Sequence, residues 1–181
     1  MREIVLKNNS IAFIRLLTKD DAELLLEYLE NLSTESRSRF GPHRFDRDTV
    51  NNICSNLAHD DVQRFVAVAD NRIVSYMLIK KGTIDADTER YVQNNVFFDT
   101  STTVTYAPSV ADVFQNTGLG SKMFAIIVSQ LKKQGCHTIV LWGGVQATNA
   151  RAVHFYKKHG FESKGNFWHN DKDNIDMLLN L

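Results

Sequence analysis

One loop that runs directly into an amphipathic helix constrains this chain more than any other feature. Residues 115–121 read QNTGLGS, and the segment 119–134 then places Met123, Ile127 and Leu131 at helical spacing. Glycine reaches backbone angles that other residues avoid, and the N–H groups at a helix start attract an anion. The loop is therefore either a pyrophosphate site or a tight turn without a ligand, and from these residues alone both interpretations stay open.

Two common nucleotide motifs do not fit this loop. Position 123 is Met, so the dinucleotide pattern GxGxxG is incomplete, and the Gly-Lys-Ser/Thr ending of a Walker loop is absent.

A second segment, residues 149–161, reads NARAVHFYKKHGF. Asn149 suits the N-cap of a helix, and Gly160 suits its end.

Hydrophobic periodicity and turn residues predict an α/β domain. Helices are expected after Thr18 and after Asp46, and again over 119–134 and 150–159. The expected strands cover residues 11–17, 63–69, 73–80, 102–107, 138–142, 162–168 and 174–179. Between the second and third of these, Asp70-Asn71-Arg72 has the chemistry of a hairpin turn. Residues 83–98 are less regular and end in two phenylalanines.

Composition narrows the possible classes of protein. At 181 residues the chain is expected to form one domain, 1–181. Lys and Arg number 21, as do Asp and Glu, so nothing in the charge favours a nucleic-acid partner. No apolar run reaches membrane-spanning length, and no secretory signal is evident, so we expect a cytoplasmic protein without a membrane partner. Cys54 and Cys136 lack metal-ligand spacing and are expected to be reduced, partly buried thiols.

The two motifs together resemble the GNAT superfamily of acyl-CoA-dependent N-acyltransferases. Gln115, Gly118 and Gly120 match its pattern of Gln or Arg, two residues, Gly, any residue, then Gly or Ala. The second motif of the family is matched by Asn149, Arg151, Ala152, Phe155, Tyr156, Gly160 and Phe161. The resemblance covers residues 104–181 well, while the N-terminal part fits only the family's order of elements.

This resemblance implies a fold and a cofactor site. The fold is a three-layer α/β (α+β) arrangement, a mixed, mostly antiparallel sheet of about seven strands flanked by about four helices. Backbone groups near residues 110–113 are implied to hold the pantetheine and thioester of acetyl-CoA, and N–H groups of 115–121 its pyrophosphate. The implied cofactor-binding residues are Val110, Ala111, Asp112, Val113, Gln115, Asn116, Thr117, Gly118, Leu119, Gly120, Ser121, Asn149, Ala152, Phe155, Tyr156 and Lys158.

By the same resemblance, Tyr156 is the catalytic acid that protonates the departing CoA thiolate. The alternative is a tyrosine that only packs against CoA. Asn149 contacts the pantetheine arm, caps its helix, or does both. Many relatives carry a glutamate as general base where this chain has Thr105. The base therefore stays open among a threonine-bound water and the side chains of Asp112, Asp99, Glu35, His43 and His169.

The acceptor side is implied to lie in residues 33–45 and 167–174. Arg37, Arg39 and His43 suit an acceptor that carries a carboxylate or phosphate, or they form an exposed basic loop. Trp168 is a substrate wall or packs in the core. Residues 83–98 cap the pocket or form a dimer contact, and their aromatic end is expected to be buried.

Three functions remain at this stage. The leading one is an N-acetyltransferase that moves an acetyl group from acetyl-CoA to a primary amine of a small molecule. The second is a non-catalytic acyl-CoA-binding module, suggested by Thr105. The third is acetylation of a protein N-terminus or lysine, since one fold serves many acceptors. A homodimer is possible, and no metal is expected.

Overall fold

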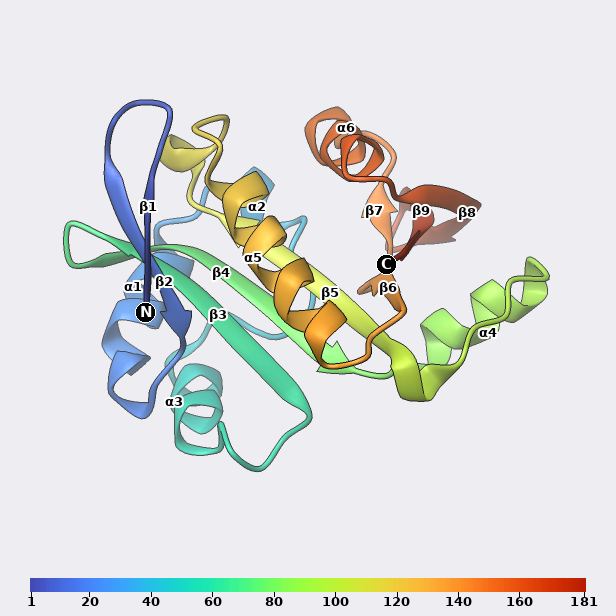
Figure 1. Cartoon of the computed structure of the whole chain (residues 1–181), viewed down its shortest axis with the longest axis horizontal. Helices are drawn as coiled ribbons and strands as arrows, with labels where there is room; N and C mark the ends of the chain where they lie inside the picture. The colour runs from blue at the N-terminus through green and yellow to red at the C-terminus, as the bar shows by residue number, and fades with distance from the viewer. The chain divides into compact units, whose positions relative to one another are not determined.

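A computed structural model describes all 181 residues, and they form two compact units (Figure 1). The first unit comprises residues 1–79 and 107–127, and the second comprises residues 80–106 and 128–181. The chain passes between the units along three elements, β4 (Arg72–Lys81), β5 (Thr103–Val110) and α5 (Leu119–Lys133). The expectation of a single domain stays a prediction.

The strands of the first unit form an antiparallel sheet in the order β1-β2-β3-β4. Its elements are β1 (Arg2–Val5), β2 (Ile11–Leu16), β3 (Val62–Ala69) and β4. Asp70 and Asn71 join β3 to β4 and both have positive φ, 48° and 58°. That backbone matches the twist of a two-residue hairpin, so the hairpin predicted from Asp-Asn is confirmed.

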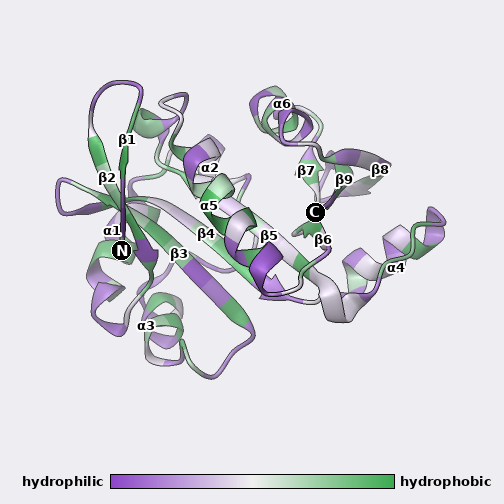
Figure 2. Ribbon diagram, viewed as in Figure 1, coloured by the Kyte–Doolittle hydropathy of each residue, from purple (hydrophilic) through white to green (hydrophobic).

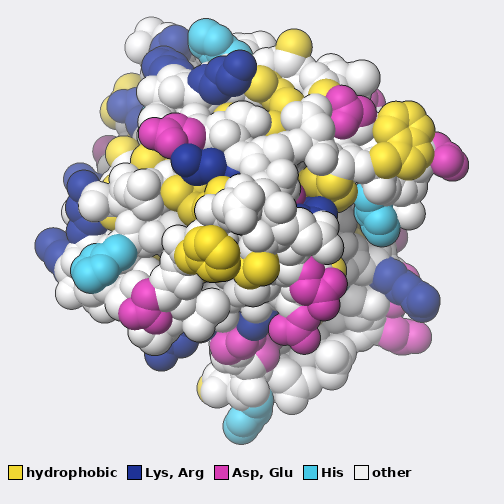
Figure 3. Space-filling view, turned by 90° about the vertical axis from the view of Figure 1, so that its right-hand side faces the viewer, with side chains coloured by type: hydrophobic (Ala, Val, Ile, Leu, Met, Phe, Trp, Pro, Cys, Tyr) yellow, Lys and Arg dark blue, Asp and Glu magenta, His cyan; other side chains and the backbone are white.

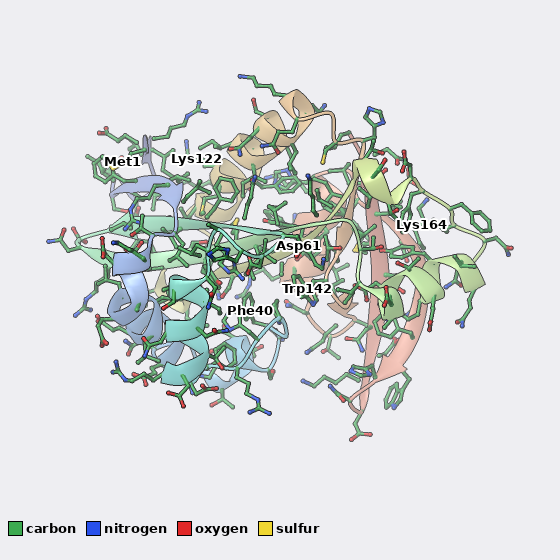
Figure 4. The ribbon with its side chains drawn as sticks, turned by 90° about the horizontal axis from the view of Figure 1, so that it is seen from below. Met1, Phe40, Asp61, Lys122, Trp142 and Lys164 are labelled. Carbon is green, nitrogen blue, oxygen red and sulfur yellow. The ribbon has the colours of Figure 1, made fainter.

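Helices cover both faces of this sheet and give the first unit three layers. The helices η1 (Lys19–Asp21), α1 (Ala22–Glu30) and α3 (Arg47–Ser55) lie on one face, and α5 begins on the other (Figures 1 and 4). The short α2 (Thr34–Arg37) follows α1. Figure 2 shows α1 with hydrophobic and hydrophilic sides, and its Leu25 and Leu29 are fully buried. Burial of such a stripe stabilises the helix more than propensity does.

The second unit is built around β9 (Lys172–Asn180). β9 pairs antiparallel with β6 (Thr138–Leu141), β7 (Val145–Gln146) and β8 (Glu162–His169). β6 in turn pairs in parallel with the first half of β5, with Thr103 opposite Thr138. All residues of β6 are buried, and the strand is hydrophobic in Figure 2. The unit also holds α4 (Asp85–Gln93), η2 (Thr100–Thr102) and α6 (Ala150–Lys158).

The predicted fold class is confirmed, because the chain is a mixed α/β structure with a mostly antiparallel sheet. The counts differ, with nine strands and six α-helices instead of about seven and four. The elements that the pattern missed are β1, β7, α2 and α4. β7 has two residues and α2 has four, too few for a period to appear. In α4 the buried residues are one tyrosine and one aspartate, so the segment lacks the apolar period that predicts a helix.

The two cysteines are free thiols, Cys54 buried and Cys136 half-buried. No helix of the chain is both long enough and apolar enough to cross a bilayer. On the face shown in Figure 3, acidic, basic and hydrophobic side chains all occur. This mixed surface agrees with the zero formal net charge.

Candidate active site

The predicted phosphate loop lies in the first unit, between η3 (Asp112–Phe114) and α5. Asn116 and Gly118 both have positive φ, 63° and 88°. The Thr117 hydroxyl donates to Phe114 O over 2.6 Å, and Lys7 N–H donates to Thr117 O over 3.0 Å. These bonds hold the loop as a tight turn directly before the helix.

The start of α5 follows the loop without a gap. Lys122 N–H donates to Gly118 O over 3.0 Å, which places the positive end of the helix dipole at the loop. A β-carbon on Gly118 would meet only the Lys7 side chain, at 3.6 Å, so φ rather than space requires glycine here. A turn of this shape at the N-terminus of a 15-residue helix fits a pyrophosphate group.

Asp112 joins the loop to the predicted acceptor segment 33–45. Its carboxylate accepts from Ser33 N–H at 2.9 Å, from Ser33 Oγ at 3.0 Å and from Ser36 Oγ at 2.6 Å. Burial alone would raise the pKa of Asp112, but these hydrogen bonds outweigh burial and lower its pKa. The carboxylate is thus ionised and occupied as an anchor of α2.

Backbone groups at the end of β5 are partly committed to the fold. Ala111 N–H donates to Val74 O over 2.9 Å, so this amide is already used within the first unit. The Gln115 side chain donates to Val110 O over 3.2 Å and so points back at the strand. Val113 is 83% exposed. Val113, one of the residues implied to hold the pantetheine, therefore does not pack in the core.

Helix α6 carries the second motif and lies in the second unit. Asn149 caps it by accepting from Ala152 N–H at 3.2 Å, so the N-cap interpretation is confirmed. Its C-terminus closes with Phe161 N–H donating to Tyr156 O over 3.0 Å, next to Gly160 at φ 88°. Ala152 and Phe155 are half-buried and Lys158 is exposed.

Tyr156 is buried, with 6% of its surface exposed. Its ring lies edge-on to Phe155 and Phe161, at centroid distances of 5.4 and 5.2 Å. Burial raises the pKa of Tyr156 well above its ordinary value, so the phenol stays protonated at neutral pH. A protonated phenol is the form that a general acid needs.

The three predicted acceptor residues of segment 33–45 are close in sequence but differ in environment. Arg37 caps the C-terminus of α1, with Nε donating to Leu32 O over 3.1 Å and Nη2 donating to Glu30 O. Arg39 pairs with Glu35 at 2.6 Å. Both arginines thus have partners within the fold, whereas the Nε2 atom of His43 is buried with no hydrogen-bond partner. Trp168, on β8 in the second unit, is 72% exposed, so the core-packing alternative for it is wrong.

The candidates for the general base also differ in burial and in hydrogen-bond partners. Thr105 is fully buried and its hydroxyl donates to Gly82 O over 2.9 Å, so the hydroxyl proton is already used in a hydrogen bond inside the second unit. The Asp99 carboxylate accepts from Ser101 N–H and Oγ and caps η2. Glu35 and Asp112 are bound as described, and His169 is exposed. Among these side chains, His43 Nε2 is an acceptor that is buried without a hydrogen-bond partner.

The irregular segment 83–98 packs within the second unit. Arg90 on α4 bonds Asp176 through Nε and Nη2, both at 2.9 Å, and also bonds Asp87. Its guanidinium lies 3.7 Å from the Phe167 ring centroid. Asp87 accepts from Gly143 N–H over 3.1 Å. One arginine therefore ties α4 to the β8–β9 hairpin and to the turn after β6.

The aromatic end of this segment behaves as expected only in part. Phe98 packs edge-on to Tyr91 at 5.3 Å, and both Val96 and Phe98 lie against the core around Val140. Phe97 instead is 74% exposed. Sequence reasoning missed the two buried aspartates, Asp87 and Asp176, and their half-buried partner Arg90, because charged residues are usually found at the surface.

The comparisons with known proteins identify the family. A model of the acetyltransferase (GNAT) family matches residues 25–161, and the chain belongs to this family. No curated protein matches the sequence significantly.

Solved structures share the fold at low sequence identity. The GNAT domain of PAT from S. lividans superposes with a TM-score of 0.75 at 18% identity, over 99% of this chain and 96% of that one. The aminoglycoside acetyltransferase AAC(6')-Ib in complex with coenzyme A has a TM-score of 0.71 at 22% identity, over 93% and 94%. The same enzyme has been solved with acetyl-CoA. A GNAT acetyltransferase from Streptococcus pneumoniae has a TM-score of 0.69 at 18% identity, over 94% and 99%.

Proposed function

We propose that the protein transfers an acetyl group from acetyl-CoA to a primary amine, with a small molecule as the acceptor. The observation that supports this most is the loop at residues 115–118, whose positive-φ residues Asn116 and Gly118 lead straight into α5. Such a loop suits the CoA pyrophosphate. Family membership and neighbours solved with CoA or acetyl-CoA agree with it.

The proposed reaction is a direct transfer. The amine nitrogen attacks the thioester carbonyl carbon, and the carbonyl oxygen becomes an oxyanion that a backbone N–H near Val110 stabilises. When the intermediate collapses, the carbon–sulfur bond breaks and Tyr156 gives its proton to the thiolate. A base takes the proton that the amine nitrogen loses. No protein nucleophile is needed, and both cysteines have raised pKa values because burial disfavours their thiolates.

A second candidate is a binding module that holds acyl-CoA without catalysis. It is favoured by Thr105, which occupies the position expected for glutamate and whose hydroxyl is bound to Gly82 O. Acetyl-CoA binding without CoA release over a broad panel of amines would support this alternative.

The test combines binding with turnover. Acetyl-CoA binding is measured by titration calorimetry, and thiol release is followed over polyamines, amino acids, amino sugars and short peptides. Gly118→Ala should weaken the binding of acetyl-CoA at least about tenfold, which is about 1.4 kcal/mol of binding free energy, because a side chain strains the loop at φ 88°. Gly135→Ala is the matched control, since φ is 77° there and its β-carbon meets open space.

If both glycine variants bind acetyl-CoA like the parent protein, the loop is not the pyrophosphate site. If peptides compete with the small amines for acetyl transfer, the acceptor is a protein amine.

A further inference from the structure

The turn between β1 and β2 carries a lysine that lies on the loop proposed for the CoA pyrophosphate. Lys7 N–H donates to Thr117 O over 3.0 Å. The Cγ, Cδ and Cε atoms of Lys7 lie 3.6, 3.9 and 3.7 Å from the point that a β-carbon on Gly118 would occupy. Figure 1 shows this turn beside the start of α5. The backbone and the side-chain stem of one residue therefore both contact the loop, within the first unit.

Hydrogen bonds within the turn hold Lys7 in place. Leu6 N–H donates to Ser10 O over 2.8 Å, and Asn9 N–H donates to Leu6 O over 3.0 Å. The Ser10 hydroxyl donates to Asn8 Oδ1 over 2.7 Å, and Asn9 has a positive φ of 63°. A turn that is closed in this way restricts the region that the side chain of Lys7 can reach.

The ammonium group of Lys7 is available to an anion from solution. Lys7 is exposed and takes part in no ion pair. Its Nζ atom is one C–N bond, about 1.5 Å, beyond Cε. Lysine side chains commonly lay their stem along the protein and keep the charged end in water. Because the stem lies on Gly118, the charged end is at the edge of the loop.

The start of α5 has positive charge that no acidic residue of its own first turn offsets. Carboxylates are favoured at a helix N-terminus, but the first turn of α5 has none. Its fourth residue is instead Lys122 (labelled in Figure 4), which forms no ion pair either. The carboxylate of Asp112, three residues before the loop, is bonded to Ser33 and Ser36. A phosphate group would neutralise the charge of Lys7 and of the helix end together.

Family membership does not imply the contact between Lys7 and the loop. The family model matches residues 25–161, and Lys7 precedes them. The contact is therefore read from the structure of this chain, where the turn before β2 reaches the loop before α5.

We propose that the ammonium of Lys7 binds the pyrophosphate of CoA, together with the backbone of residues 115–121. This inference rests on the proposed use of acetyl-CoA. An ammonium donates charge-assisted hydrogen bonds to phosphate oxygens and acts as a compact point charge. The pyrophosphate is remote from the thioester, so Lys7 contributes to the affinity for the cofactor and not to the chemical step.

The test compares Lys7→Met with the parent protein by titration calorimetry. Methionine keeps an unbranched stem on Gly118 and the N–H that donates to Thr117, but it removes the charge. The Kd of acetyl-CoA should rise at least about fivefold, because a charge-assisted hydrogen bond is lost. Lys7→Arg keeps the charge and should retain most of the affinity. Lys19→Met is the matched control, since Lys19 is an exposed lysine of η1 on the other face of the sheet, and its Kd should equal the parent's.

Further measurements separate phosphate binding from a structural role of Lys7. Dephospho-CoA keeps the pyrophosphate and lacks the 3′-phosphate, so Lys7→Met should weaken its binding by the same factor as that of CoA. The dependence of Kd on salt should be shallower in Lys7→Met, because one screened charge contact is lost. Without cofactor, the melting temperature of Lys7→Met should equal the parent's, because an exposed, unpaired charge contributes little to stability.

The outcomes are separable. The assignment is wrong, and the proposed function remains, if Lys7→Met binds acetyl-CoA as tightly as the parent protein. The same holds if Lys7→Met weakens CoA but not dephospho-CoA, or if its lost affinity comes with a lowered melting temperature and an unchanged salt dependence. If the parent protein itself does not bind acetyl-CoA, the proposed function fails, and this inference fails with it.

Discussion

Two arginines that pair with aspartates, one in each unit, show how alike and how different charged clusters can be. Arg90 bonds Asp87 and Asp176 and lies on Phe167, and no polar side-chain atom of these residues is left buried without a partner. Arg64 has an equally close aspartate, Asp60, but the Asp60 side chain is 36% exposed, whereas the side chains of Asp87 and Asp176 are 1% exposed. A satisfied cluster is what a structural role requires. A carboxylate that water can reach depends less on its arginine than one that is closed off from water.

The largest expected effect is in the Arg90 cluster, which we define as Arg90, Asp87 and Asp176. Arg90→Met leaves two aspartates, each 1% exposed, without their counter-charge. The free energy of unfolding should fall by about 3–5 kcal/mol in urea denaturation. Arg72→Met is the control, because Arg72 is exposed and its ion pair with Glu27 is long, at 3.4 Å. This substitution should change the free energy of unfolding by less than about 0.5 kcal/mol. A loss of similar size in both variants would contradict the conclusion that Arg90 holds α4 in the second unit.

The same substitution in the other cluster should cost less. Arg64→Met leaves Asp60, whose side chain is 36% exposed and can be hydrated. We expect a loss of about 1–2 kcal/mol, measured in the same urea titration. An Arg64→Met loss as large as that of Arg90→Met would show that the Arg64–Asp60 pair matters just as much for stability.

The pH dependence should have opposite signs at two buried aspartates. Burial raises the pKa of Asp87 above 3.8, although bonds from Gly143 and Arg90 oppose it. Burial also acts on Asp21, but there the hydrogen bond from Arg15 and those from Thr18 prevail and lower its pKa. The contribution of Asp87 is complete below its unfolded pKa and is lost as the pH rises through its folded pKa. The contribution of Asp21 is present above its unfolded pKa and is lost as the pH falls through its folded value.

Stability measured from pH 7 down to about 3 checks these signs. Relative to Asp87→Asn, the parent protein should gain stability as the pH falls from neutral toward 3.8. Relative to Asp21→Asn, it should lose its advantage below 3.8. Parallel curves for the two variants would contradict both assignments.

The smallest expected effect compares two buried tyrosines. Tyr91 Oη donates to Met177 O over 2.8 Å, so Tyr91→Phe should lower stability by about 1 kcal/mol. Tyr76 Oη bonds no carbonyl and interacts instead with the Arg64 side chain, so Tyr76→Phe should cost less than Tyr91→Phe. Thermal unfolding of both variants side by side tests this, and equal losses would mean that the Tyr76 hydroxyl is bonded as well as that of Tyr91.

Sequence reasoning found what local chemistry determines. The hairpin at Asp70 and Asn71, the N-cap at Asn149 and the helix after Gly118 each follow from one or two residues. It also pointed to Tyr156 and to the loop that we propose for the pyrophosphate, because each family motif is contiguous in the chain.

It missed what depends on contacts between distant residues. Arg90 and Asp176 are 86 positions apart, and Ser33 and Asp112 are 79 apart. Nor did the sequence indicate that Arg37 caps α1, where open carbonyls at a helix end bond a nearby guanidinium. The pairing of these charges is not visible in a one-dimensional pattern.

The most direct test of the central claim is CoA release from acetyl-CoA by the parent protein, by Tyr156→Phe and by the control Tyr91→Phe, each at saturating acceptor. We predict release with an amine acceptor, a fall in kcat of about 10²–10⁴ in Tyr156→Phe, and a kcat close to the parent's in Tyr91→Phe. An unchanged kcat in Tyr156→Phe would refute the role of Tyr156 as the acid. Tight acetyl-CoA binding with no release for any amine would refute acetyl transfer itself.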